Sequence, residues 1–305
     1  MIKHIHLMRY IIKLFIGLLF ISAFVSCSEK QRLSKDFTAE FGFTAGIEGS
    51  AVNAEGDLFA VNFEREGTIG KVNKAGEAEV FISLPEGSIG NGIRFDLDGN
   101  MFVADYLGHK VYRIKKGSKT PEVWAMDSTM NQPNDLAVGP GGIIYLSDPN
   151  WAESTGKLWM VSPEREILLI EEGMGTTNGI EVSPDYKTLY VNESVQRVVW
   201  KYDIREDGSL DNKKKFISFA DFGLDGMRCD IEGNLYLTRY DKGTVAIVSP
   251  EGKVLEEVVL KGKKPSNIAF GGDNGLDCYV TMADRGCFET FEALSPGNYY
   301  SKIHY

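Results

Sequence analysis

The chain has 305 residues, of which 43% are hydrophobic and 25% charged, the composition of an ordinary globular protein. Its formal net charge of −10 disfavours a polyphosphate partner, so no binding to nucleic acid is expected. It contains only four histidines and four cysteines, which restricts the nucleophilic and metal chemistry open to it. Length alone would suggest about two domains.

The first 26 residues differ from the rest of the chain. Lys3, Arg9 and Lys13 lie before or beside an apolar run over residues 14–25, and no acidic residue occurs in this segment. This pattern predicts an export signal, because the run is shorter than the ~20 residues that a membrane-spanning helix needs. Its removal would lower the formal net charge from −10 to −13, since three basic residues leave with it.

Ser26 and Cys27 follow the apolar run and resemble the lipobox of bacterial lipoproteins, although Phe24 stands where Leu is usual. The resemblance implies that Cys27 becomes the lipidated first residue of the mature chain and that residues 28–35 form a tether. The protein would then be exported and attached to the bacterial cell envelope only through its lipid. Cleavage and secretion as a soluble protein is the alternative.

The remaining chain repeats a unit that begins with an oxygen-bearing side chain. The units start at Glu48, Asn91, Asn134, Asn178, Asp225 and Asn267, 42 to 47 residues apart. Each start is followed by a turn and by a short aromatic and β-branched strand, such as LFAVNF (58–63) or LYLTRY (235–240), and then by further strands. Four strands in each of six units predict an all-β, six-bladed β-propeller, a single domain over residues 36–305.

The sixth unit lacks a fourth strand. We expect the N-terminal segment around residues 36–41 to supply it and so to close the ring. Cys278 and Cys287 fall in this unit, where they could lie on neighbouring strands and form a disulfide. Buried free thiols are the alternative for these two residues and for Cys229.

The first strand of each propeller blade lines the central channel, so the six unit starts are expected to converge there. Two of them, Glu48 and Asp225, are carboxylates that would repel each other unless a positive charge lies between them. A set of oxygen ligands predicts a divalent cation, calcium first, with magnesium, manganese or zinc as possible substitutes. Asn before Gly is also common turn chemistry, so each asparagine taken alone has a structural alternative.

Histidine chemistry is improbable at this site. His4 and His6 belong to the predicted signal, and neither His109 nor His304 is placed to assist a nucleophile. General base catalysis would therefore fall to a carboxylate.

Three longer runs resemble the family of senescence marker protein, gluconolactonase and luciferin-regenerating enzyme. They are GNGIRFDLDGNMFVADY (90–106), PNDLAVGPGGIIYLSDP (133–149) and LDGMRCDIEGNLYLTRY (224–240). The resemblance covers residues 45–290. It implies a six-bladed propeller that binds a divalent cation, usually calcium, and hydrolyses sugar lactones or related esters.

The resemblance also implies roles for individual residues. Glu48, Asn178 and Asp225 match the cation ligands, Asn134 matches a residue that contacts cation or substrate, and Asp225 matches the acid/base group. No ligand role transfers to Asn91 or Asn267, which are expected to be structural.

Two further residues are candidates for contact with the substrate. Gln132 stands where sugar lactonases often carry an arginine, which argues against an aldonolactone as the substrate. Asp148 ends the second strand of the third blade and would help to shape the pocket, with turn capping as the alternative.

The sequence thus predicts a metal-dependent hydrolase that opens a small lactone or ester by attack of water, with Asp225 as the base. A phosphotriester hydrolase resembling diisopropyl fluorophosphatase is the alternative among enzymes. A propeller that binds a sugar or a protein without catalysis is the alternative outside them.

Overall fold

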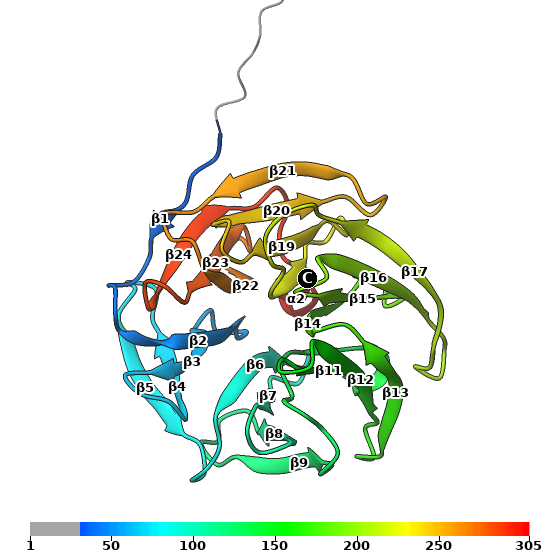
Figure 1. Ribbon diagram of the computed structural model, residues 1–305. Coiled ribbons are helices and arrows are strands. Elements are labelled where there is room, and N and C mark those ends of the chain that lie inside the picture. Colours follow the sequence, from blue (N-terminus) through cyan, green and yellow to red (C-terminus); the bar gives the residue numbers. More distant parts are fainter. Residues whose placement is uncertain (1–30, 305) are drawn as a thin grey trace, which may run out of the picture. The chain divides into compact units, whose positions relative to one another are not determined.

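The computed structural model describes residues 31–304, and residues 32–305 form one compact unit. In that unit, six four-stranded sheets with antiparallel neighbours are arranged radially around a central channel (Figure 1). The predicted six-bladed β-propeller is therefore confirmed.

In each of the first five blades, the four strands follow one another in sequence from the channel to the rim. Blade one comprises β2 (Phe43–Val52), β3 (Leu58–Phe63), β4 (Thr68–Val72) and β5 (Ala78–Ser83), and blade two comprises β6 (Gly90–Phe95), β7 (Met101–Asp105), β8 (Lys110–Ile114) and β9 (Glu122–Met126). Blade three comprises β10 (Leu136–Val138), β11 (Ile144–Asn150), β12 (Thr155–Val161) and β13 (Ile167–Met174), with the 3₁₀ turn η1 (Pro140–Gly142) between β10 and β11. Blades four and five comprise β14 (Thr177–Val182), β15 (Thr188–Glu193), β16 (Val198–Ile204) and β17 (Leu210–Ser218); and β18 (Met227–Cys229), β19 (Leu235–Arg239), β20 (Thr244–Val248) and β21 (Val254–Val259).

The core lies between the blades. Second strands such as β3 and β19 are buried along their whole length, whereas the outermost strands β5 and β21 have one buried residue each. The buried side chains form six clusters, and each cluster joins two adjacent blades. A blade therefore buries its apolar faces only when both of its neighbours are present, as expected for a repeat architecture.

The sixth blade is built from both ends of the described chain. Its strands β22 (Pro265–Gly271), β23 (Asp277–Met282) and β24 (Cys287–Glu292) are completed at the rim by β1 (Lys35–Asp36). The pairing continues beyond β1, because Phe41 N donates a hydrogen bond of 2.9 Å to Arg285 O. The expectation that an N-terminal segment closes the ring is confirmed.

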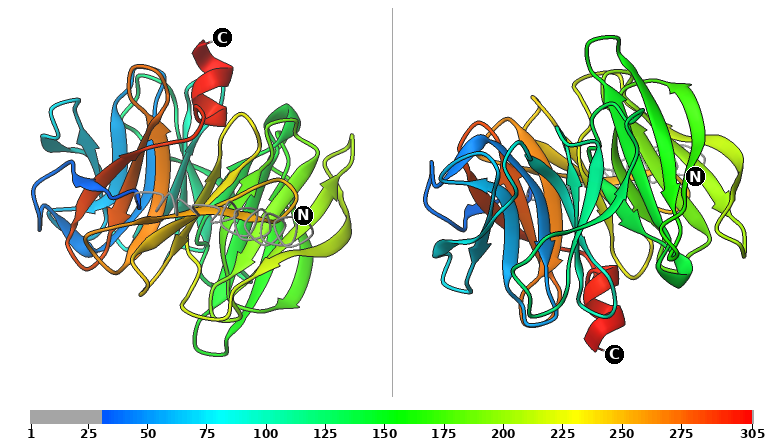
Figure 2. Two further views of the ribbon diagram at one scale, coloured as in Figure 1. Left: turned by 90° about the horizontal axis from the view of Figure 1, so that it is seen from above. Right: turned by 90° about the horizontal axis from the view of Figure 1, so that it is seen from below.

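A C-terminal helix, α2 (Asn298–His304), was not expected from the sequence. It lies at one end of the channel and projects from that face of the propeller (Figure 2). Tyr299 anchors it, donating a hydrogen bond of 3.1 Å from its hydroxyl to Asp96 O and stacking on Phe95. Seven residues are too few to show a helical period or to be stable alone, so these tertiary contacts determine the helix.

The three described cysteines are buried free thiols. Cys278 pairs in register with Phe291, and Cys287 pairs with Met282 on the neighbouring strand. The two cysteines are thus four positions apart along the ladder, roughly 13 Å at 3.3 Å per residue, which is too far for a disulfide. The alternative of free thiols describes the structure.

The predicted signal and the lipidated Cys27 lie outside the described residues. Within residues 31–304, no helix is long and apolar enough to cross a membrane.

Candidate functional site

The axial residues lie where the inner strands depart from regular pairing. Glu48, Asn91, Asn178 and Asn267 each fall within a register shift between the first and second strands of a blade. In the third and fifth blades, the inner strand begins only two residues after the axial residue. Such irregularities turn side chains out of the sheet, and here they turn them into the channel.

The glycine that follows most axial residues leaves room for the next blade. A Cβ added to Gly49 would lie 2.1 Å from Asn91 O, and one added to Gly226 would lie 2.4 Å from Asn267 Cγ. The recurring acid-Gly or Asn-Gly step is therefore a packing requirement around the channel, in addition to any role of the axial side chain.

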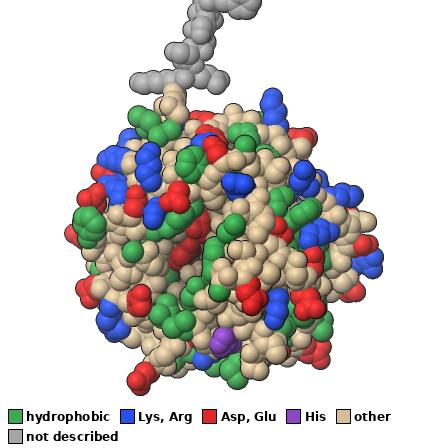
Figure 3. Space-filling model, in the orientation of Figure 1, with side chains coloured by type: hydrophobic (Ala, Val, Ile, Leu, Met, Phe, Trp, Pro, Cys, Tyr) green, Lys and Arg blue, Asp and Glu red, His purple; other side chains and the backbone are tan. Residues whose placement is uncertain are grey.

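Five of the six axial residues line one cavity of about 440 Å³, which is distinct from the cavity that residues of α2 line at the other ends of the inner strands. They are Glu48, Asn91, Asn134, Asn178 and Asp225. On the face seen in Figure 3, acidic side chains lie at the bottom of a central hollow. The structure thus brings together all four residues expected to hold a cation, while Asn267 stands behind them.

Two carboxylates, the buried Asp225 and the partly buried Glu48, dominate the electrostatics of this cavity. Burial raises the pKa of Glu48 to about 7, against hydrogen bonds to Glu48 Oε2 from Asn267 Nδ2 (2.9 Å) and Gly49 N (2.8 Å). Burial, and then the charge of Glu48, raise the pKa of Asp225 well above its usual value. Each carboxylate therefore resists ionisation beside the other, which a cation between them would relieve.

The two amides supply oxygen without charge. Asn178 lies next to the Asp225 carboxyl and lowers its pKa, and Asn134 is 6% exposed. The Oδ1 atom of Asn134 is buried without a hydrogen-bond partner. An acceptor without a partner, in the same cavity as the carboxylates of Glu48 and Asp225, fits a hard cation that takes oxygen ligands.

Other metal chemistry is disfavoured in the part of the chain that the structure describes. No group of three or more His, Cys, Asp or Glu side chains is placed to hold a metal there. The candidate set combines two acids with two amides and contains no nitrogen or sulfur ligand, so the donors match calcium or magnesium better than zinc.

Asp148 and Gln132 do not line this cavity. The Asp148 carboxylate is fully buried and accepts hydrogen bonds from Asn131 N (2.8 Å), Gln132 N (2.6 Å) and Trp159 Nε1 (2.9 Å). Asp148 therefore caps the loop that leads to Asn134, so the turn-capping alternative describes its role. Burial raises the pKa of the Tyr106 phenol, and a hydrogen bond with the Gln132 side chain opposes that rise, so Gln132 contacts a residue of the cavity lining without lining the cavity itself.

The rim of the cavity was missed by sequence reasoning. One residue from the end of the second strand of each blade, or from just beyond it, contributes to the rim. These residues are Asn62, Tyr106, Trp151, Ser194, Tyr240 and Ala283. The rim could have been predicted, because the second strand of each blade runs antiparallel to the inner strand and therefore ends at the face where the inner strand starts.

The cavity lining holds three acids, Glu48, Asp225 and the rim residue Glu66, and contains no lysine, arginine or histidine. Three of the rim residues are aromatic. Chemically, this site can hold a cation, polarise a bound carbonyl and enclose a small, partly apolar molecule.

Fold and site together define a class: six-bladed propellers whose channel ends in a pocket lined with oxygen ligands. Within that class, the family model described as "SMP-30/Gluconolactonase/LRE-like region" matches residues 47–284. The chain therefore belongs to this family.

The sequence identity to individual relatives is low. The chain is 26% identical over 201 residues to pentonolactonase XacC of Haloferax volcanii, covering 65% of this chain and 68% of that protein. It is 30% identical over 219 residues to the gluconolactonase of Zymomonas mobilis, covering 63% of this chain and 60% of the relative. The crystal structure of a calcium-binding protein, regucalcin, from Agrobacterium tumefaciens superposes with a TM-score of 0.70 at 19% identity, covering 84% and 98% of the two chains, which shows the shared fold.

Proposed function

We propose that the protein is a divalent-metal-dependent hydrolase that opens a small lactone ring with water. The observation that carries the proposal is that one cavity of about 440 Å³ is lined by two mutually destabilised carboxylates, those of Glu48 and Asp225, and by Asn134, whose Oδ1 has no hydrogen-bond partner. Two relatives named as lactonases, from Haloferax volcanii and Zymomonas mobilis, support the choice of reaction.

Glu48, Asn134, Asn178 and Asp225 would hold the cation, and calcium is our first choice. When bound, the cation supplies positive charge that polarises a lactone carbonyl and lowers the pKa of water. Asp225 accepts a proton from the attacking water, and the ring C–O bond breaks as the new C–O bond forms. The proton then passes to the ring oxygen, which leaves as the hydroxyl group of a hydroxy acid.

The substrate that fits this cavity is uncharged. No basic side chain lines it, and Glu66 at the rim adds negative charge beyond the two carboxylates that a cation would neutralise. The aromatic rings of Tyr106, Trp151 and Tyr240 offer apolar area to a ring substrate. A neutral lactone with limited hydroxylation is therefore favoured over a phosphorylated or sulfonated sugar lactone.

The proposal is tested by measuring hydrolysis of a panel of lactones, aryl esters and a phosphotriester with calcium-loaded and chelated protein. We expect lactone hydrolysis that chelation abolishes and calcium restores. Asp225→Asn should lower kcat by at least about 100-fold, the typical contribution of a general base. The matched control is Asp207→Asn, because Asp207 is an exposed acid in a surface turn. Full lactonase activity in excess chelator would refute the mechanism, and activity on the phosphotriester alone would reassign the reaction.

A further inference from the structure

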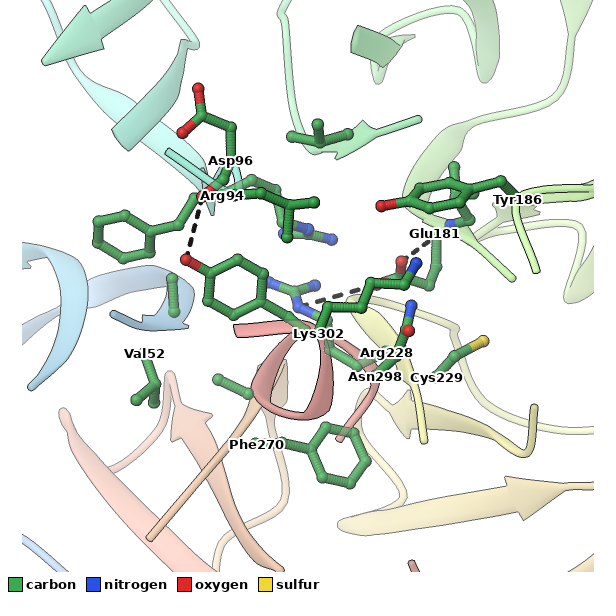
Figure 4. A pocket seen from close by; sticks show the side chains of 17 residues that line it. Val52, Arg94, Asp96, Glu181, Tyr186, Arg228, Cys229, Phe270, Asn298 and Lys302 are labelled. Carbon is green, nitrogen blue, oxygen red and sulfur yellow. Dashed lines mark hydrogen bonds and ion pairs between the residues drawn. The ribbon is translucent and has the colours of Figure 1, made fainter. Parts of the chain in front are cut away.

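A second cavity, of about 90 Å³, lies at the opposite end of the channel beneath α2 (Figure 4). Its walls come from inner-strand residues or from residues just beyond them, such as Val52, Val182 and Phe270, and α2 contributes Asn298, Tyr299 and Lys302. The first cavity is lined by the beginnings of the inner strands and this one by their ends, so the two are distinct.

Two buried arginines stand side by side in its wall. Arg94 is 8% exposed and Arg228 is 9% exposed. Burial, and then the like charge of Arg94, lower the pKa of Arg228. The two guanidinium groups therefore share an environment in which a further negative charge would be stabilising.

Most of their donors are committed, but not all. Arg94 makes two hydrogen bonds to the Asp135 carboxylate, at 2.8 and 3.1 Å, and donates to Ile93 O and Ile180 O at 3.0 Å each. Its Nε has no partner and is buried. Arg228 donates to the backbone carbonyls of Met227 and Ser50, and its Nε lies 3.9 Å from Glu181 Oε2, beyond hydrogen-bond length.

Lys302 brings a third base from the helix. Its ammonium lies 3.3 Å from the centroid of the Tyr186 ring and has no hydrogen-bond acceptor among the described residues. Burial lowers its pKa to about 8, against the opposing effect of Glu181. Figure 4 shows Lys302 extending from α2 towards Glu181 and Tyr186.

Few carboxylate oxygens around the cavity are free to accept a hydrogen bond from these basic side chains. Asp96 accepts hydrogen bonds from Asn100 N (2.7 Å) and Asn100 Nδ2 (2.8 Å), so it is occupied by its own turn. Asp135 is engaged by Arg94 and by Leu136 N (2.9 Å). Glu181 Oε1 accepts a hydrogen bond from Val182 N (2.8 Å), so Glu181 Oε2 is the one carboxylate oxygen of the described cavity lining without a hydrogen bond, whereas three basic side chains line the cavity.

We propose that this rear cavity is a binding site for a small oxyanion, specifically a short-chain carboxylate. The donors of Arg228 and Lys302 would bind the carboxylate oxygens, as guanidinium and ammonium groups commonly do, and the adjacent charge of Arg94 would add to the attraction. The apolar side chains of Val52, Val182 and Phe270 would contact the alkyl part. A volume of about 90 Å³ is that of roughly three water molecules in the liquid, which limits the ligand to a few carbon atoms.

The test uses the full protein and titrates acetate, propionate and inorganic phosphate against chloride at constant ionic strength. Thermal unfolding and isothermal titration calorimetry are the two readouts. We expect a saturable rise in Tm with acetate or propionate, because a ligand that binds only the folded state stabilises it. A saturable rise with phosphate alone would keep the oxyanion site but overturn its assignment to carboxylates.

Three variants distinguish this site from non-specific anion effects. Lys302→Met should weaken acetate binding about tenfold or more, the expected loss for a hydrogen bond to a charged group. Lys187→Met, which removes an exposed lysine next to Tyr186 in the sequence, should leave binding unchanged. Glu181→Gln should tighten binding, because it removes the one acid that competes with the ligand.

The proposal fails if no oxyanion gives a saturable shift, or if Lys302→Met and Lys187→Met respond equally. Circular dichroism of each variant without added anion shows whether the fold is retained. Because the readouts are binding and stability, the outcome does not depend on whether the lactonase function is correct.

Discussion

Asn267 Nδ2 donates a hydrogen bond of 2.9 Å to Glu48 Oε2, so an amide of the sixth blade holds a carboxylate of the first. The two residues are 219 positions apart in the sequence and meet only because the ring closes. The bond orients Glu48 toward the candidate cation site and opposes the rise in its pKa that burial causes.

Loss of this bond should therefore weaken cation binding. Asn267→Ala removes a hydrogen bond to a charged group, worth about 1.5–3 kcal/mol, so calcium affinity should fall by at least about tenfold. Calorimetric titration of calcium measures the change. Asn274→Ala, at an exposed turn, is the control. Unchanged affinity in Asn267→Ala would show that Glu48 is held by other contacts.

Gly226→Ala should damage the same region through steric overlap. Gly226 does not have a positive φ, yet an added Cβ would lie 2.4 Å from Asn267 Cγ, so that side chain must move. We expect a loss of about 1–3 kcal/mol in the free energy of unfolding together with weaker calcium binding. The control is Gly42→Ala, whose Cβ would meet Phe63 at an ordinary 3.5 Å. Equal stability of the two variants in urea would contradict the expectation.

Glu66 should select against anionic substrates. Glu66→Lys reverses the charge at the rim, so kcat/KM for a negatively charged lactone should rise by about tenfold at low salt, while a neutral lactone changes little. Glu64→Lys provides the matched control, because Glu64 is exposed nearby but does not line the cavity. A rise in kcat/KM of similar size in both variants would show that the overall charge of the protein causes the effect.

Arg285 should contribute strongly to closure of the ring. It pairs with the fully buried carboxylate of Glu289 at 2.5 Å and with Asp36 at 2.8 Å, so it joins β24 to the N-terminal strand. Arg285→Met should cost about 3 kcal/mol in the free energy of unfolding, because it removes the charged partner of a buried acid that keeps only neutral donors such as Lys261 N and Gly262 N. Arg205→Met removes an exposed pair with Asp211 and should leave the free energy of unfolding nearly unchanged. Chemical denaturation of both variants measures the two changes in the free energy of unfolding.

Stability should depend on pH through Lys302. Its folded pKa of about 8 lies below the ordinary value for lysine, so the folded state releases this proton first. Between about pH 8 and 10 the unfolded state binds more protons, and the contribution of Lys302 to the free energy of unfolding therefore rises with pH.

This pH contribution should be absent in Lys302→Met, and the difference between the two proteins in thermal unfolding isolates it. Binding of acetate should weaken over the same range, because the neutral amine no longer attracts the anion. Glu181, Asp185, Cys229 and Tyr186 are the other titratable groups near Lys302, and they remain in the variant. Parallel pH profiles for the two proteins would exclude Lys302 as the source.

The sequence was sufficient for the fold because every repeat carries the same turns and strands. It also indicated which side chains converge, since Glu48 and Asp225 occupy equivalent positions in their repeats. Spacing places such residues at one end of the channel without any knowledge of contacts between blades.

Other features depend on contacts that no repeat encodes. The pairing of Arg94 with Asp135 joins two inner strands from different blades, and α2 is held by contacts such as that of Tyr299 with Asp96. The role of Asp148 could not be settled either, because its three donors become visible only when the loop before Asn134 is folded. The rim could have been predicted from strand direction, but its chemistry varies from blade to blade.

The glycines beside the channel bear on how such a protein can change over evolution. Gly49 leaves space for the backbone at Asn91, and Gly226 leaves space for Asn267, so each blade is shaped to fit its successor. Blades with similar sequences are for this reason not interchangeable modules. A duplicated or transplanted blade would fit only if the neighbour that faces it changed as well, so the repeats must diversify in adjacent pairs.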